Sequence, residues 1–271
     1  MSDQLVPFLK WAGGKRWFTQ RYARMFPQNF NLYIEPFLGG GSVFFHLKPQ
    51  QALLGDLNED LINAYSCIRD DWEPITNLLV QHQLNHCVDY YYHMRETIPT
   101  NLCERAARLI YLNRTCFNGI YRVNRQGMFN VPKGTKDSVV FETDDFEKMS
   151  ITLLNAELRT SDFEPLIEEA NHGDFIFADP PYTVRHNQNG FIKYNENLFS
   201  WNDQIRLAAA LRRAYDRGAI ILSSNANHHL VRELYEDQGF NIETVSRYSS
   251  ISADPSKRKQ YEEIIISANI H

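Results

Sequence analysis

The sequence predicts an α/β fold with a segment of different character inserted into it. Short apolar runs alternate with helical patterns at both ends of the chain, and this alternation is typical of strands joined by helices. Between about residues 66 and 150 the pattern changes to mainly helical segments. Several of the apolar runs end in glycine-rich or acidic turns, which favours a binding site at the carboxyl ends of the strands.

Composition limits the classes of protein that the chain can belong to. Of its 271 residues, 43% are apolar, which supports a sizeable core, and no apolar run is long enough to span a membrane. The net charge of −5 argues against nucleic-acid binding by the whole surface, although a local basic patch stays possible. Four scattered cysteines indicate reduced thiols in a cytosolic protein and predict neither a metal site nor a disulfide framework.

The chain opens with a glycine-containing loop. Residues 8–15 pass from an apolar start to Gly13, Gly14 and Lys15, and an amphipathic helix is predicted from about Trp17 to Met25. Two glycines let a backbone approach another group closely. The spacing is not that of a phosphate-binding loop, so a simple loop-to-helix joint is the alternative.

The next elements form the first half of a βαβ unit. A short strand at 32–34 leads into a glycine-rich turn and a helix through Phe45, and a second strand at 52–55 ends at Asp56. An acidic residue after the second strand can accept hydrogen bonds from a ribose, so a cofactor that contains a nucleoside is expected. The spacing does not match a dinucleotide fingerprint, and Asp56 could instead, or in addition, cap a helix that starts near Glu59.

The inserted segment combines helices with a predicted β-hairpin. Residues 90–95 and 106–112 look helical, and turn signals at Asn118-Gly119 and 124–127 favour a hairpin within 113–133. Cations and aromatic residues interleave there: Arg114, Arg122, Arg125, Lys133 and Lys136 with Phe117, Tyr121 and Phe129. That mixture suits a nucleic-acid reader, and an ordinary solvated hairpin is the alternative.

After residue 150 the alternation resumes, and it leads to the most distinctive turn in the chain. Residues 151–154 lead to 157–163, another strand end that carries a carboxylate, and a helix is expected near 165–170. The apolar run at 175–178 then ends in Asp179-Pro180-Pro181-Tyr182. Two prolines make a stiff turn that presents a carboxylate, carbonyl groups and a ring, which together can hold a flat polar group. A plain strand-ending turn is the alternative.

The rest of the chain is predicted to form further strands and helices, separated at two places by longer loops. Residues 183–197 form a polar stretch typical of a lid or substrate loop, and the basic cluster within 249–260 could contact phosphates or be a solvated turn. The remaining elements are a helix from Ser200 to Asp216 that starts with a capping box, a strand at 219–225, a helix at 229–235, and an antiparallel pair at 241–248 and 262–268.

Taken together, these segments resemble the α group of N6-adenine DNA methyltransferases, and most of all the Dam family. The match covers nearly the whole chain, in the order K-W-A-G-G-K, E-P-F with its glycines, N-G-x-x-R-x-N-x-x-G-x-F-N-V-P, and D-P-P-Y. The resemblance implies a Rossmann-like, seven-stranded, mostly parallel sheet with a reversed last strand. It also implies a catalytic domain of residues 1–65 and 150–271 and a helical target-recognition domain of residues 66–149 that carries the hairpin.

The resemblance also implies the ligands and the residues that bind them. The methyl donor would be S-adenosylmethionine, the product S-adenosylhomocysteine, and the partner double-stranded DNA containing GATC, with no metal, membrane or obligate protein partner. The cofactor would contact Trp11, Lys15, Phe37, Gly39, Asp56, Asp162, Phe163 and Asp179. The DNA would contact Lys10, Phe117, Asn118, Ile120, Arg122 and Pro132. The enzyme would be cytoplasmic and associated with the nucleoid through DNA.

The chemistry of the proline turn fits this resemblance. Asp179 and the Pro180 carbonyl could each accept a hydrogen bond from the N6 amine of adenine. Pro181 would stiffen the turn, and Tyr182 would stack on a base flipped out of the duplex. Ile120 and Thr135 depart from the family's usual leucine and arginine, which leaves the recognised sequence open.

Several alternatives stay open at this point. The substrate could be another DNA site, RNA or cytosine N4, although Asp rather than Ser before the prolines favours adenine by resemblance. A catalytically silent DNA-binding protein is also possible, whereas a dehydrogenase is disfavoured because no dinucleotide fingerprint is present.

Overall fold

The computed structural model describes residues 5–124, 127–182, 199–248 and 260–270. The predicted substrate loop at 183–197 and the basic cluster at 257–259 lie outside the described residues. The chain divides into two compact units, which are described in turn. Unit 1 comprises Met1–Thr19, Leu38–Gln50 and Leu54–Thr160, and unit 2 comprises Gln20–Phe37, Gln51–Leu53 and Ser161–His271.

The strands form a seven-stranded sheet in the order β3-β2-β1-β4-β5-β7-β6. Their bounds are β1 Tyr33–Glu35, β2 Ala52–Asp56, β3 Ala156–Thr160, β4 Phe175–Ala178, β5 Ile220–Ala226, β6 Asn241–Tyr248 and β7 Gln260–Ala268. Within unit 2, β1 pairs with β4 and β4 with β5 in parallel, whereas β7 runs antiparallel to both β5 and β6. The predicted α/β sheet with one reversed strand is therefore confirmed.

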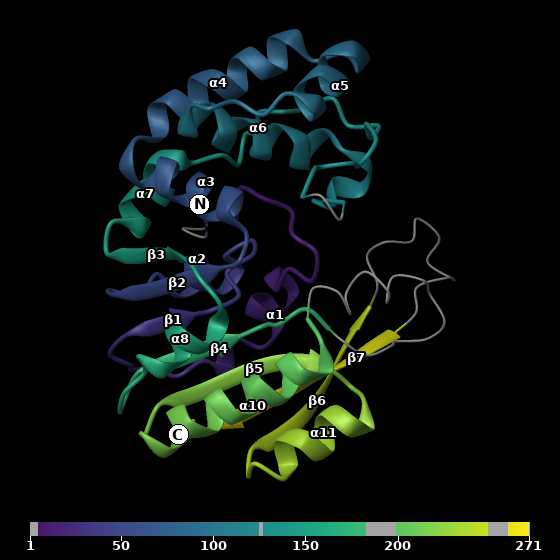
Figure 1. The fold of residues 1–271 in the computed structure, drawn as a ribbon. Helices are drawn as coiled ribbons and strands as arrows, with labels where there is room; N and C mark the ends of the chain where they lie inside the picture. Colours follow the sequence, from purple (N-terminus) through teal and green to yellow (C-terminus); the bar gives the residue numbers. More distant parts are fainter. Residues whose placement is uncertain (1–4, 125–126, 183–198, 249–259, 271) are drawn as a thin grey trace. The chain divides into compact units, whose positions relative to one another are not determined.

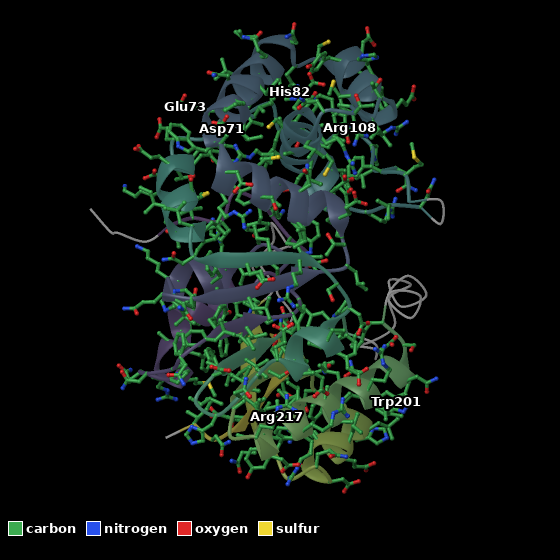
Figure 2. The ribbon with its side chains drawn as sticks, turned by 60° about the vertical axis from the view of Figure 1, so that its left-hand side comes forward. Asp71, Glu73, His82, Arg108, Trp201 and Arg217 are labelled. Atoms are coloured by element: carbon green, nitrogen blue, oxygen red, sulfur yellow. The ribbon has the colours of Figure 1, made fainter. Side chains whose placement is uncertain are left out.

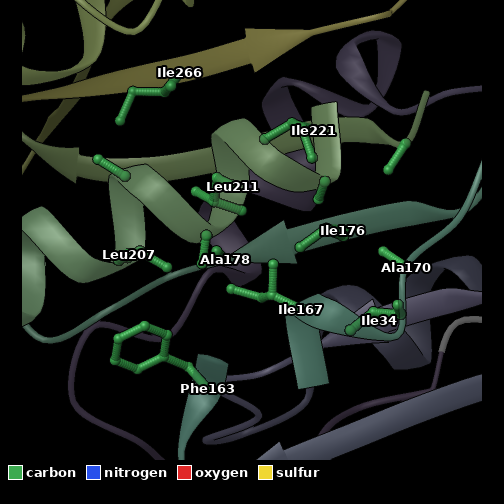
Figure 3. Close-up of a cluster of buried hydrophobic side chains, with 14 of the residues drawn as sticks. Ile34, Phe163, Ile167, Ala170, Ile176, Ala178, Leu207, Leu211, Ile221 and Ile266 are labelled. Carbon is green, nitrogen blue, oxygen red and sulfur yellow. The ribbon is translucent and has the colours of Figure 1, made fainter. Parts of the chain in front are cut away.

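Unit 2 is built around an apolar core beneath its strands. Alternate residues of the central strands, such as Ile34, Ile176 and Ile221, contribute to one buried cluster, and Figure 3 shows Leu211 of a covering helix among them. The helical elements of this unit are η1 Ala23–Met25, α8 Phe163–Glu168, α10 Trp201–Asp216 and α11 His229–Glu236. In Figure 1, α10 lies along β5, in agreement with their contacts.

Local signals determine where the long helix α10 begins and ends. The predicted capping box is present, because the Ser200 hydroxyl accepts from the Asp203 N–H while the Asp203 carboxylate accepts from the Ser200 N–H. At the other end Gly218 takes a φ of 91°, which favours glycine. The Arg217 side chain, labelled in Figure 2, donates to the carbonyls of Ala170 and Ile167 and so ties the end of α10 to the segment at the end of α8.

Unit 1 is mainly helical. Its helical elements are α2 Ser42–Leu47, α3 Glu59–Asp70, α4 Trp72–Asn85, α5 Val88–Glu96, α6 Leu102–Thr115, η2 Phe117–Gly119 and α7 Phe146–Leu153. Helix α6 is the centre of this unit, because it contacts α3, α4 and α5 (Figure 1). Its buried Arg108, labelled in Figure 2, donates to the carbonyls of Met94 and Arg95 at 2.6 and 2.7 Å, which caps the end of α5.

Two sequence expectations need correction. The helix predicted from Trp17 to Met25 is interrupted: α1 spans Arg16–Arg21, and a 3-10 turn follows at Ala23–Met25. Tyr22 between them has a ψ of 24°, which is outside the helical range. The run at 151–154 lies mostly within α7 rather than in a strand, and the strand end predicted after it corresponds to β3.

Candidate active site and nucleic-acid interface

The glycine-rich turn after β1 is joined to Asp56 at the end of β2. The Asp56 carboxylate accepts from the Gly39 N–H at 3.1 Å and from the Asn58 N–H at 3.0 Å. Burial raises the pKa of Asp56, and these backbone hydrogen bonds act against that rise. The Asn58 side chain, rather than Asp56, caps α3 by accepting from the Leu61 N–H. The helix-cap interpretation of Asp56 was therefore wrong, and its carboxylate instead fixes the turn.

Trp11 packs directly against this turn. A Cβ atom on Gly39 would lie only 2.8 Å from Trp11 Cδ1, so a side chain at Gly39 would displace the indole ring. Gly39 also has a φ of 47°, a conformation that favours glycine. Lys15 is buried, and its ammonium group donates to the Gly13 carbonyl at 3.0 Å. These contacts place Trp11, Gly39 and Asp56 around one turn, as expected of a shared binding site.

The segment that follows α6, residues 116–133, carries most of the predicted DNA contacts and is called the recognition segment for that prediction. Phe117 is 54% exposed, and Asn118, Arg122 and Pro132 are exposed beside it. Arg122 Nε donates to Asn130 Oδ1 at 3.3 Å, which orients the guanidinium group. This exposed set includes one ring, one cation and one amide, which are groups that a reader of nucleic acid can use.

The predicted hairpin is irregular. Among the described residues its two arms form no continuous ladder: two isolated antiparallel bridges join Cys116 with Lys133 and Val123 with Phe129, and a few backbone hydrogen bonds lie beside them. Arg114, which was predicted as one of its cations, is the last arginine of α6 and only 4% exposed. Its guanidinium group donates to both oxygens of Asp144, so Arg114 has a structural role, and its assignment to the DNA-facing hairpin was wrong.

Lys10 is held against the recognition segment by bonds that the sequence did not suggest. The buried side chain of Asn113 accepts from the Lys10 N–H at 2.9 Å and donates to the Lys10 carbonyl at 2.8 Å. The Lys10 ammonium group donates to the Asn118 carbonyl at 2.6 Å. Tyr121 then stacks on Trp11, with ring centroids 5.4 Å apart and planes inclined by 16°. The predicted cofactor residue Trp11 therefore contacts the recognition segment.

In unit 2 the proline turn is supported by two neighbouring strands. Ser224 of β5 donates to Asp179 Oδ1 at 2.7 Å. Its neighbour Ser223 donates at 2.8 Å to the carbonyl of Ala178, which belongs to β4 and precedes the turn. Tyr182 donates its hydroxyl proton to Glu263 Oε2 of β7 at 2.7 Å. Burial, followed by the charges of Asp179 and Glu263, raises the pKa of Tyr182 well above its usual range.

Three further predicted cofactor residues lie in unit 2: the aromatic pair Phe37 and Phe163, and Asp162. Phe37 stacks on Phe163 with ring centroids 5.4 Å apart, and Phe163 is only 3% exposed. Asp162 caps α8, because its Oδ1 accepts from the Glu164 N–H at 3.0 Å, and the same atom accepts from Arg206 at 2.8 Å. Any contact from Asp162 to a ligand must therefore be made beside this existing ion pair.

A comparison with protein families decides the class of the chain. Residues 11–251 match the family described as D12 class N6 adenine-specific DNA methyltransferase. The chain belongs to this family of adenine-specific DNA methyltransferases. The family model covers the glycine turn, the recognition segment and the proline turn, and of the segments that carried the resemblance only Lys10, the first residue of K-W-A-G-G-K, lies outside it.

Relatives of this D12 methyltransferase match it over almost its full length. It is 36% identical to the type II methyltransferase M1.LlaDCHI of Lactococcus lactis, over 97% of this chain and 95% of that protein. It is 34% identical to the type II methyltransferase M.MjaIII of Methanocaldococcus jannaschii, over 97% and 99% of the two chains. The DNA adenine methylase of Haemophilus influenzae is 34% identical over 96% and 92%.

Sequence reasoning about this methyltransferase missed the residues that support its site. Asn113, Tyr121, Ser224 and Glu263 all contact predicted site residues, yet only Tyr121 carried a signal, as one of the aromatics of the predicted hairpin. In the part of the chain that the structure describes, no helix has the length and apolar character needed to cross a membrane.

Proposed function

We propose that this enzyme transfers a methyl group from S-adenosylmethionine to N6 of adenine within GATC in double-stranded DNA, and that the target adenine is flipped out of the duplex. The observation that carries the proposal is the proline turn, where Asp179 is oriented by Ser224 and Tyr182 by Glu263. A flat base with an exocyclic amine fits a turn that offers acceptors at its edge and a ring for its face.

The residues of the turn make the amine a better nucleophile. The lone pair of adenine N6 is delocalised into the ring, so the amine reacts poorly in its planar form. Asp179 and the Pro180 carbonyl each accept a hydrogen bond from the N6 amine. These hydrogen bonds favour a more tetrahedral nitrogen, whose lone pair points out of the plane of the adenine ring. Pro181 keeps the turn stiff, and Tyr182 stacks on the base. Positioning and electrostatics supply most of the rate, because the methylated amine is a cation that loses its proton readily.

The chain also has groups that fit the cofactor. S-adenosylmethionine supplies a methyl group on a positively charged sulfur. Asp56 would hold the ribose hydroxyls, because it ends β2 with a carboxylate already fixed by the Gly39 turn. Trp11 would cover the cofactor where Gly39 leaves room for its ring. We assign the remaining contacts to Lys15, Phe37, Asp162, Phe163 and Asp179.

Site choice would come from Lys10 and from the segment after α6. Arg122 would contact a guanine edge, Phe117 would insert into the base stack, and Lys10 would contact the first guanine. Asn118, Ile120 and Pro132 would complete the reading surface. The exposure of Phe117 and Arg122 supports this assignment. We further propose that residues 66–149 act as the target-recognition domain and residues 1–65 and 150–271 as the catalytic domain.

The test of the catalytic assignment is Asp179→Ala. We expect methyl transfer to duplex DNA to be abolished while binding of S-adenosylhomocysteine and the melting temperature stay close to those of the wild type. Single-molecule sequencing of DNA from cells that express each protein gives the modified base and its context together. Near-normal methylation by the variant would refute the role of Asp179, and modification of a different base or sequence by the wild type would refute the proposed substrate.

The test of the recognition assignment is Arg122→Ala. A good contact to a base edge contributes about 1–3 kcal/mol of discrimination, so the variant should methylate sites that differ from GATC at one position much more readily relative to GATC. The ratio of kcat/KM for matched and mismatched duplexes measures this change. An unchanged ratio would remove Arg122 from the reading surface. Ile120 and the exposed Thr135 favour a second candidate, which is methylation of adenine in a different DNA sequence.

A further inference from the structure

Glu263 is an ionisable residue buried at the reversed strand. Its exposed fraction is 1%, and it precedes the buried run Ile264, Ile265 and Ile266 of β7. Burial of a carboxylate costs free energy unless hydrogen bonds compensate, so such a residue is unusual in an apolar strand. The Tyr182 hydroxyl donates to Glu263 Oε2 at 2.7 Å, which connects this strand to the proline turn.

Ser224 makes the second connection, from the neighbouring strand. It is 1% exposed, and its hydroxyl donates to Asp179 Oδ1 at 2.7 Å. The register places Ser224 only two positions before Ala226, which pairs with Glu263 across β5 and β7. The two residues that hold the turn therefore lie two register positions apart on the adjacent strands β5 and β7.

We propose that Glu263 and Ser224 are positioning residues for methyl transfer: Glu263 fixes the plane of the Tyr182 ring, and Ser224 fixes the direction in which the Asp179 carboxylate accepts. This inference rests on the proposed function, since it assumes that Tyr182 stacks on adenine and that Asp179 accepts from N6. The side chain of a tyrosine rotates about two bonds, and a hydrogen bond that holds its hydroxyl oxygen in place fixes the first rotation. The hydroxyl oxygen lies on the axis of the second rotation, but a phenol O–H prefers the plane of its ring, so an acceptor in a fixed place also favours one ring plane.

The protonation state of Tyr182 suits this role. Burial and the nearby carboxylates raise the pKa of its hydroxyl well above the ordinary value, so the hydroxyl stays protonated and donates throughout the working pH range. What Tyr182 needs from position 263 is therefore an acceptor oxygen, which glutamine also supplies. Replacing Glu263 by glutamine therefore distinguishes two roles: a positioning role survives the change, whereas a role that needs the negative charge does not.

The first experiment compares Glu263→Gln with Glu263→Ala in single-turnover methylation of a GATC duplex. Loss of the acceptor should lower the rate by about 10- to 100-fold, as expected for a misplaced reacting group, while Glu263→Gln should stay within about threefold of the wild type. KM for the cofactor should not change in either variant. Equal losses in the two variants would overturn the inference, because they would show that the charge is what matters.

Tyr182→Phe provides the readout that does not depend on the fold of the Glu263 variants. It keeps the stacking ring and removes the anchoring hydroxyl, so it should lower the rate as much as Glu263→Ala does, and the double variant should lose no more than either single variant. Wild-type turnover in Tyr182→Phe, or losses that multiply in the double variant, would overturn the role of Glu263.

Ser224 is tested against its neighbour. Ser224→Ala removes the bond to Asp179, whereas Ser223→Ala removes a bond of similar length to a backbone carbonyl from an equally buried residue of the same strand. We expect a rate loss of about tenfold or more only in Ser224→Ala. Equal rates in the two variants would overturn the role of Ser224. Absence of methylated adenine with the wild-type protein would instead count against the proposed function.

Discussion

The sharpest prediction concerns Gly39, where one added methyl group should disturb the proposed cofactor site. A Cβ atom at this position would lie 2.8 Å from Trp11 Cδ1 and 3.3 Å from Trp11 Nε1, so the indole ring would have to move. Trp11 cannot move without disturbing its stack on Tyr121. The φ of 47° at Gly39 adds backbone strain for any other residue.

The magnitude follows from these two effects. A left-handed conformation costs a residue with a side chain about 1–2 kcal/mol, and loss of an aromatic stack costs about 0.5–1.5 kcal/mol. Gly39→Ala should therefore lose about 1.5–3.5 kcal/mol of unfolding free energy, which lowers the melting temperature by about 3–14 °C. Affinity for S-adenosylhomocysteine should fall about 2- to 13-fold under the proposed assignment, in which Trp11 covers the ligand and its displacement removes that contact.

Gly40→Ala is the matched control for this prediction. A Cβ atom there would lie 3.4 Å from Trp11 Cβ and 3.5 Å from the Leu9 carbonyl, which are ordinary contacts, and its φ is not in the left-handed range. Thermal denaturation and calorimetric titration with S-adenosylhomocysteine should show little change in this variant. Wild-type affinity in Gly39→Ala, or an equal loss in Gly40→Ala, would refute the argument that the turn positions Trp11.

Two further predictions test the proposed ribose contact of Asp56 and the stability of unit 1. Burial raises the pKa of Asp56, so this carboxylate takes up a proton at a higher pH than an ordinary aspartate does. The protonated carboxyl accepts poorly from ribose hydroxyls. Cofactor binding should therefore weaken as the pH falls through the raised pKa of Asp56. Asp56→Asn should bind weakly without this pH dependence, as titrations at several pH values would show. Asp144→Ala leaves the guanidinium group of Arg114 buried without its carboxylate and should cost about 3–5 kcal/mol in denaturant unfolding. Asp137→Ala, at an exposed carboxylate, should change stability little.

Features governed by local chemistry could be predicted from the sequence. The capping box at Ser200 and the strand that ends just before Asp179 follow from residues that are neighbours in the chain, and β6 and β7 are strands that follow one another in the sequence. Proline, glycine and capping side chains act on the backbone within a few residues, so their effects can be identified without knowledge of the tertiary structure.

The residues that support the site could not be predicted in this way. Tyr182 and Glu263 are 81 positions apart, and Lys10 and Asn113 are 103 positions apart. No residue near Glu263 in the sequence identifies Tyr182 as its partner, because the order of the strands in the sheet brings these two residues together. The same reason explains the error at Arg114, whose residue type suited DNA although its place on a buried helix face did not.

The arrangement of cations shows why an acidic protein can still choose a DNA site. Arg108 and Arg114 are buried and bonded to the protein, so they cannot neutralise phosphates. Lys10 and Arg122 are exposed, but Lys10 is bonded to the Asn118 carbonyl and Arg122 to Asn130, which fixes their directions. In the part of the chain that the structure describes, these two oriented cations by themselves would add little non-specific attraction, because that attraction depends on the number of phosphate contacts. Discrimination depends on geometry at the base edge, so the same few cations can supply it.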